Sequence, residues 1–133
     1  MRTLEEFLGG RARLLAFEYK TDARGALIPL AFDELPFVPK RSFFVHGVPT
    51  GMVRGGHGHR TARQLLFCVS GSISVLLLYG SEQVSVSLDD CSHGLLIEAG
   101  VWSQQAYLTP GSVLCALASE PFSTASYSPS VTP

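Results

Sequence analysis

Two histidines separated by one residue form the part of this sequence that is best suited to chemistry. His57 and His59 stand just ahead of an apolar run over 65–69. Side chains at positions i and i+2 of a β-strand share a face, so we expect both imidazoles to project together. Imidazole titrates near neutrality, so the pair could take up and return protons without a metal. The alternative is two structural histidines whose hydrogen bonds are satisfied.

Arginines lie on both sides of the histidine pair, at Arg41, Arg54, Arg60 and Arg63. A guanidinium offers a rigid bidentate fork that matches the oxygens of a diphosphate. Arg54 enters the histidine strand, and we interpret it as a binding residue. Arg60 and Arg63 fit better as exposed surface arginines.

The spacing around the histidines matches the first signature motif of the cupin fold, from Gly51 to Gly71. Metal-binding cupins carry Glu at position 64, where this chain has Gln64. The second motif should fall over 98–103, and its ligand position is Ser103. A zinc or iron site needs three or four ligands, so we expect no metal and no cofactor. A metal-dependent cupin enzyme is the weaker alternative.

Aromatic residues complete the expected pocket. Phe43 and Phe44 alternate faces on a strand, so one belongs to the core and the other can face a pocket. Trp102, as a lone tryptophan, is more often a core residue than a platform for a ligand. The residues that we expect to bind substrate are Arg41, Phe43, Arg54, Gln64, Trp102 and Ser103.

The composition excludes several classes of protein. With 46% hydrophobic and 16% charged residues, the chain suits a compact barrel and not a disordered segment. A net charge of −1 gives no basic field for nucleic acid or a membrane. No apolar run approaches the roughly 18 residues of a spanning helix. Three cysteines without CxxC spacing favour reduced thiols and a cytoplasmic location.

The elements that must position the candidate residues are short strands. The pattern predicts a helical turn over 3–8, then strands over 13–19, 26–32, 41–47, 64–69, 72–78, 83–88, 91–97, 105–108 and 112–118. Period-2 patterning with regular turns indicates an all-β sandwich or barrel. We expect one domain over 1–133. Its strands within 1–47 would extend the sheet of a second copy to form a homodimer, and its tail over 123–133 would be flexible.

Longer runs of the sequence resemble one family. They include Leu35-Pro36-Phe37, Arg54-Gly55-Gly56-His57-Gly58-His59, Cys68-Val69-Ser70-Gly71-Ser72 and Gly100-Val101-Trp102. Over about 25–120 the chain is similar to the sugar-nucleotide 3,4-ketoisomerases of the cupin superfamily, the WxcM-like group of FdtA/QdtA type. This implies a dimeric double-stranded β-helix (jelly-roll) barrel that acts on a dTDP-4-keto-6-deoxyhexose without metal.

The resemblance also implies roles for individual residues. The family moves a carbonyl from C4 to C3 through an enediol, and His57 matches the base that shuttles the proton. His59, Arg41 and Arg54 match positions near the active site or the diphosphate. The family usually has Tyr at 43 or 44, and His or Arg at 103. These departures favour a rival hypothesis, a cupin that binds a nucleotide-sugar without turning it over.

Overall fold

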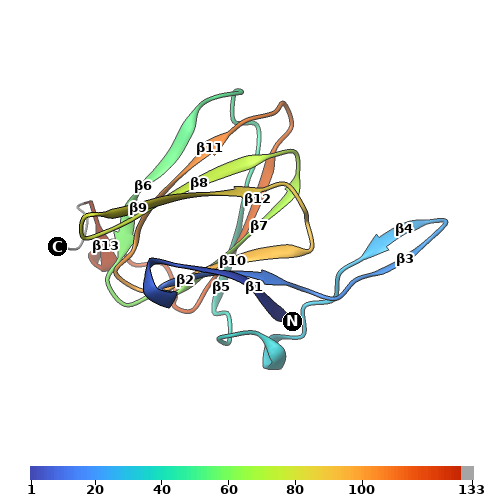
Figure 1. The fold of residues 1–133 in the computed structure, drawn as a ribbon, viewed down its shortest axis with the longest axis horizontal. Coiled ribbons are helices and arrows are strands. Elements are labelled where there is room, and N and C mark those ends of the chain that lie inside the picture. Colours follow the sequence, from blue (N-terminus) through green and yellow to red (C-terminus); the bar gives the residue numbers. More distant parts are fainter. Residues whose placement is uncertain (130–133) are drawn as a thin grey trace.

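The computed structural model describes residues 1–129, which form two antiparallel sheets packed face to face (Figure 1). The six-stranded sheet has the order β1 (Arg2–Phe7), β2 (Ala12–Ala16), β10 (His93–Ile97), β7 (Gln64–Ser70), β12 (Val113–Ala118), β5 (Arg41–Val45). The five-stranded sheet has the order β13 (Tyr127–Ser128), β6 (Val53–His59), β11 (Trp102–Tyr107), β8 (Ile73–Tyr79), β9 (Glu82–Leu88). The prediction of an all-β barrel is confirmed.

The core lies between the two sheets and follows the alternation of side chains along each strand. On β8, Ile73, Val75 and Leu77 are fully buried, while the residues between them are only partly buried. Each such side chain stabilises the fold by about 1.5–3 kcal/mol. Within the described residues no helix is long and apolar enough to cross a membrane.

Strand β7 departs from alternation because both of its faces are covered. Leu66 and Cys68 join the core between the sheets, whereas Leu65 and Phe67 belong to a second apolar cluster. That cluster is packed by four residues of the connection over 28–37: Ile28, Leu30, Leu35 and Phe37. A central strand that is buried on both faces reads as a continuous apolar run.

The N-terminal part of the chain differs from two predictions. The segment expected to form a helical turn is β1, whose residues Arg2 to Phe7 pair with β2. Isolated short helices are marginal in water, so pairing with a neighbouring strand decides the conformation. The strand predicted over 26–32 is limited to β4 (Gly25–Leu27), which ends before Pro29. Proline has no N–H to donate to a sheet.

Strand β4 pairs with β3 (Lys20–Asp22) in an arm that extends away from the two sheets (Figure 1). Three short 3-10 helices complete the described fold: η1 (Leu8–Gly10), η2 (Phe32–Glu34) and η3 (Thr124–Ser126). The last of them leads into β13, which pairs with β6, and the flexibility expected for the tail over 123–133 stays a prediction. The rest of that tail, 130–133, lies outside the described residues.

Candidate active site

A cavity of about 340 Å³, called here the His57 cavity, lies between the two sheets. Its walls come from β5, β7 and β12 of the six-stranded sheet and from β6, β11 and β13 of the other. It is lined by Arg41, Phe43, Phe44, Val45, Arg54, Gly55, His57, Gln64, Leu66, Ser103, Gln105, Leu114 and Tyr127. Most of the residues expected to bind substrate therefore meet in one cavity.

The two histidines lie side by side, as the i, i+2 spacing predicts, but only one of them lines the cavity. Their ring centroids are 5.3 Å apart and the rings are nearly perpendicular. His57 lines the His57 cavity, whereas His59 is buried, with 8% of its surface exposed. The two imidazoles therefore have different roles. His57 can contact a ligand in the cavity, and His59 packs against His57.

Both imidazoles are held in the neutral form at neutral pH. Burial lowers the pKa of His57, opposed by a hydrogen bond with the Gly55 backbone and aided by the positive charge of Arg41. Burial also lowers the pKa of His59, to about 4, and the charges of His57 and Arg41 act in the same direction. A neutral imidazole has a free lone pair, which a general base requires.

The burial of His59 predicts that the protein loses stability in mild acid. Its pKa is about 4 in the folded protein against an ordinary value of 6.5. Between these values the unfolded chain binds a proton that the folded chain does not, so the free energy of unfolding falls as the pH falls. The slope is at most about 1.4 kcal/mol per pH unit for this one group.

Urea unfolding at pH 7 and pH 5 measures this effect. The replacement His59→Gln should reduce the loss of stability between the two pH values, because the group that titrates is gone. The matched control is His46→Gln, at an exposed position just after β5, which should keep the wild-type pH dependence. An unchanged pH dependence in His59→Gln would contradict the assignment.

The cationic and aromatic residues of β5 and β6 lie on the cavity wall. Arg41 and Phe43 line it from β5, with the Arg41 guanidinium 4.8 Å from the centre of the Phe43 ring. Arg54 lines it from β6. Of the two phenylalanines, Phe43 packs against the core, while Phe44 is 66% exposed. The cavity therefore has two guanidinium groups beside a neutral imidazole.

Trp102 is not where we expected it. It is absent from the cavity wall, although Ser103 beside it on β11 is buried and lines the cavity. Successive residues of a strand face opposite sides, so an inward Ser103 turns Trp102 outward. The indole N–H donates a hydrogen bond of 3.3 Å to the carbonyl of Pro129. Trp102 thus holds the returning C-terminal segment and does not line the cavity.

The two positions expected to break a metal site are both at the cavity. Gln64 and Ser103 are buried and line it. Among residues 1–129 no group of three or more His, Cys, Asp or Glu side chains is arranged to hold a metal ion. The expectation of no metal stays a prediction, which elemental analysis of the purified protein would test.

The other arginines near the histidines lie away from the cavity wall. Arg60 is exposed, as expected. Arg63 is not a free surface arginine: it forms an ion pair of 2.7 Å with Glu98 and donates to the carbonyl of Pro36 at 2.9 Å. Arg63, just ahead of β7, thus holds the segment over 28–37 that covers the second apolar cluster.

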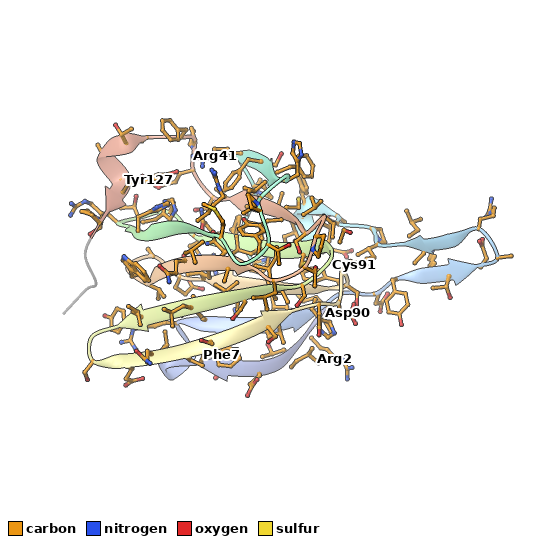
Figure 2. The ribbon with its side chains drawn as sticks, turned by 90° about the horizontal axis from the view of Figure 1, so that it is seen from above. Arg2, Phe7, Arg41, Asp90, Cys91 and Tyr127 are labelled. Carbon is orange, nitrogen blue, oxygen red and sulfur yellow. The ribbon has the colours of Figure 1, made fainter. Side chains whose placement is uncertain are left out.

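Tyr127 is the residue at the site that the sequence did not predict. Strand β13 places it opposite His59 on β6. Its ring stacks on His57 with centroids 4.5 Å apart and lies edge-on to His59 at 4.5 Å. Its hydroxyl oxygen accepts a hydrogen bond of 3.1 Å from Arg41, and the two side chains meet at one edge of the molecule (Figure 2). The only local signal was an aromatic residue in a Ser-rich ending.

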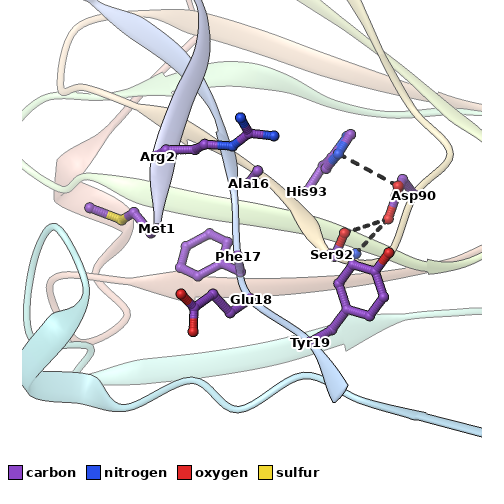
Figure 3. A pocket seen from close by; sticks show the side chains of 9 residues that line it. All are labelled: Met1, Arg2, Ala16, Phe17, Glu18, Tyr19, Asp90, Ser92 and His93. Carbon is purple, nitrogen blue, oxygen red and sulfur yellow. Dashed lines mark hydrogen bonds and ion pairs between the residues drawn. The ribbon is translucent and has the colours of Figure 1, made fainter. Parts of the chain in front are cut away.

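A larger hollow of about 570 Å³ lies elsewhere, beside β1 and β2 (Figure 3). Its wall includes Arg2, Tyr19, Asp90, Ser92 and His93, and none of the expected site residues. The Asp90 carboxylate already accepts a hydrogen bond of 2.7 Å from the Ser92 hydroxyl and lies 3.5 Å from His93. The Asp90 carboxylate is thus engaged with its neighbours, and the larger volume alone does not make the hollow the functional site.

Comparisons with known proteins agree with this geometry. A curated relative, TDP-4-oxo-6-deoxy-alpha-D-glucose-3,4-oxoisomerase of Aneurinibacillus thermoaerophilus, is 28% identical over 116 residues, covering 86% of this chain and 84% of its own. The crystal structure of QdtA, a sugar 3,4-ketoisomerase from Thermoanaerobacterium thermosaccharolyticum in complex with TDP, is 32% identical. It matches with a TM-score of 0.87 over 90% of this chain and 88% of its own.

A second solved structure, the WlaRB TDP-quinovose 3,4-ketoisomerase from Campylobacter jejuni, is 28% identical. It matches with a TM-score of 0.84 over 90% of this chain and 92% of its own. Residues 11–132 match the FdtA family, described as WxcM-like, C-terminal. The cupin-type jelly roll, the histidine cavity and this match over nearly the whole chain agree, and the protein belongs to the FdtA family of WxcM-like proteins.

Proposed function

We propose that this protein is a sugar-nucleotide 3,4-ketoisomerase, which moves the carbonyl of a TDP-linked 4-keto-6-deoxyhexose from C4 to C3. The observation that carries the proposal is a neutral His57 on the wall of a cavity that also holds two guanidinium groups. The relatives named above are isomerases of this kind, which supports the same reaction class for this chain.

The reaction needs a base that can remove a proton from a carbon next to a carbonyl. In our proposal the His57 imidazole takes the proton from C3, which gives an enediol, and returns it to C4. A general base must be unprotonated at the working pH, and burial, which lowers the pKa of His57, favours that form. His59 packs against His57 and adds no acid of its own at neutral pH.

The diphosphate of a TDP-sugar carries the charge that the cavity can recognise. Arg41 and Arg54 come from two strands and line the same wall. In the proposal they hold the diphosphate so that the sugar ring reaches His57. These arginines contribute by positioning the substrate. Positioning can supply a large part of the rate acceleration when it holds the reacting atoms close together.

The rival hypothesis of a binding protein without turnover rests on Phe43 and Ser103. Neither offers the phenol or the cation that the family usually has there. An isomerase remains better supported, because a neutral imidazole on the cavity wall is the group that enolisation needs.

The test is incubation with TDP-4-keto-6-deoxyglucose in deuterated water, followed by NMR of the sugar ring. We expect the carbonyl signal to move from C4 to C3, with deuterium at the carbon that was reprotonated. A sugar that binds but shows neither change would favour the binding protein.

We also propose that the protein is a homodimer, through the β3–β4 arm and the strands near it. The arm and the connection after it expose large apolar side chains: Tyr19 (57%), Leu27 (63%), Phe32 (51%) and Val38 (64%). Exposed apolar surface of this kind is typical of interfaces. The cytoplasmic location also stays a prediction, from the odd number of cysteines.

Light scattering tests the dimer. We expect about twice the chain mass of 14.3 kDa at micromolar concentration. The replacement Leu27→Asp should shift the equilibrium toward the monomer, because a charge would be buried at the interface. The control Leu108→Asp changes another exposed leucine, 46% exposed and far from the arm in the sequence. A wild-type protein with the monomer mass would reject the proposal.

A further inference from the structure

The proposed carbonyl shift has a requirement that His57 does not meet. It moves one hydrogen between two carbons and another between two oxygens, since O4 must gain a proton and O3 must lose one. A base that carries the proton between C3 and C4 accounts only for the hydrogen that moves between the carbons. A second group is needed that can donate a proton to one oxygen and accept one from the other.

The wall of the His57 cavity offers few groups for this task. A guanidinium such as that of Arg41 or Arg54 offers donors but no acceptor, and the amide of Gln64 is neither an acid nor a base near neutral pH. The hydroxyl of Ser103, which also lines the cavity, is a much weaker acid than a phenol. The other tyrosine near the site, Tyr107, is fully buried, lies outside the cavity wall, and burial raises its pKa to about 12. Within the described residues that leaves the phenol of Tyr127.

The position of Tyr127 suits proton transfer at oxygen. Its ring is stacked on His57, with centroids 4.5 Å apart and planes 21° from parallel. The phenol is therefore beside the imidazole, on the wall that the sugar must approach. Two neighbouring groups of this kind could serve two neighbouring carbons and their oxygens at once.

The hydrogen bond from Arg41 suits the same role. The guanidinium donates to the phenol oxygen at 3.1 Å, so the phenol keeps its own proton free to donate to a ligand. A fixed positive charge also sits where negative charge would appear on that oxygen when the proton leaves. Preorganised charge at such a place is a major source of catalysis.

We infer that Tyr127 is the catalytic acid–base for the sugar oxygens, an inference that rests on the proposed ketoisomerase function. His57 takes the proton from C3, the C–H electrons form the C3=C4 bond, and O4 takes the proton from the Tyr127 hydroxyl. The enediol then gives its O3 proton to the Tyr127 oxygen as the C3=O bond forms. The C3=C4 electrons take the proton back from His57 at C4, so both side chains end as they began.

A purely structural role for Tyr127 makes a different prediction. Its ring packs on His57, His59 and Phe122, and β13 is paired to β6. A phenylalanine would keep all of these ring contacts and would lose only the hydroxyl. The replacement Tyr127→Phe therefore separates the two roles.

The experiment measures kcat with TDP-4-keto-6-deoxyglucose and the Kd for TDP in Tyr127→Phe. We expect kcat to fall about a hundredfold or more, with the Kd for TDP within about threefold of wild type. The matched control is Tyr19→Phe, an exposed tyrosine outside the His57 cavity, which should keep wild-type values. A kcat within threefold of wild type overturns the inference, and so does a loss of TDP affinity as large as the loss of kcat.

A pH profile gives a second readout that a structural role would not change. The titratable or charged groups that contact Tyr127 are Arg41 on β5 and His57 and His59 on β6. Replacing Tyr127 by a fluorinated tyrosine keeps the ring and makes the phenol more acidic. The pH profile of kcat/KM should differ from that of the wild type, and an unchanged profile would overturn the inference.

The same assays separate this inference from the proposed function. Wild-type protein that does not convert the substrate would reject the ketoisomerase itself. Wild-type protein that converts it, together with a fully active Tyr127→Phe, would reject only the role of Tyr127.

Discussion

The replacement His57→Asn should lower kcat by about four orders of magnitude and leave the Kd for TDP within about threefold of wild type. Asparagine has a similar polar shape but no lone pair that can accept a proton from carbon. General acid–base groups contribute up to about 10⁴-fold to catalysis, and His57 is the only neutral imidazole on the described cavity wall. The loss should appear in kcat because the base acts after binding.

NMR in deuterated water gives the sharpest measurement for this variant. Deuterium incorporation at the sugar carbon should stop along with turnover, since the same proton transfer produces both. The control His46→Asn changes an exposed histidine just after β5 and should be fully active. Exchange at the wild-type rate in His57→Asn would show that another group removes the proton.

The replacement Arg54→Ala should raise the Kd for TDP by about tenfold to a hundredfold, with a smaller change in kcat. The Arg54 guanidinium lines the cavity, and within residues 1–129 no carboxylate lies within ion-pair distance of it. It is therefore available to an anionic ligand. Hydrogen bonds to charged groups contribute about 1.5–3 kcal/mol each, which corresponds to this range.

Calorimetric titration with TDP at two salt concentrations measures the effect of Arg54. The wild-type affinity should weaken with salt more steeply than that of Arg54→Ala, because one charged contact is missing in the variant. The control Arg60→Ala removes an exposed guanidinium that does not line the cavity. Equal affinities in Arg54→Ala and Arg60→Ala would contradict the role of Arg54 in binding.

Much of the candidate site could be predicted because it lies on regular strands. The i, i+2 rule places His57 beside His59, and the spacing of the cupin motif brings Gln64 to the same cavity. The same rule, applied to the strand that carries Ser103, would have predicted that Trp102 faces away from the cavity. That error arose because the strand was expected to begin at residue 105, whereas β11 begins at Trp102.

Tyr127 could not be predicted by local rules. Nothing in the pattern around it marks a strand, and β13 exists because the chain returns to the free edge of β6 after η3. The prediction of a helical turn in the N-terminal segment was wrong for the same reason. Strand β1 is extended only because β2 is available as its partner. Pairing between distant segments overrides weak local preference in both places.

The order of strands in the six-stranded sheet has a consequence for folding kinetics. Strands β2 and β5 come from the first third of the chain, and their partners β10 and β12 come from its last third. Such pairs require long loops to close before any contact is gained, which slows folding. The β8–β9 hairpin is local and can form early, but the cavity wall needs β5, β6, β11 and β13 together. During refolding from urea, recovery of TDP binding should therefore coincide with the slowest phase that reports on β-structure.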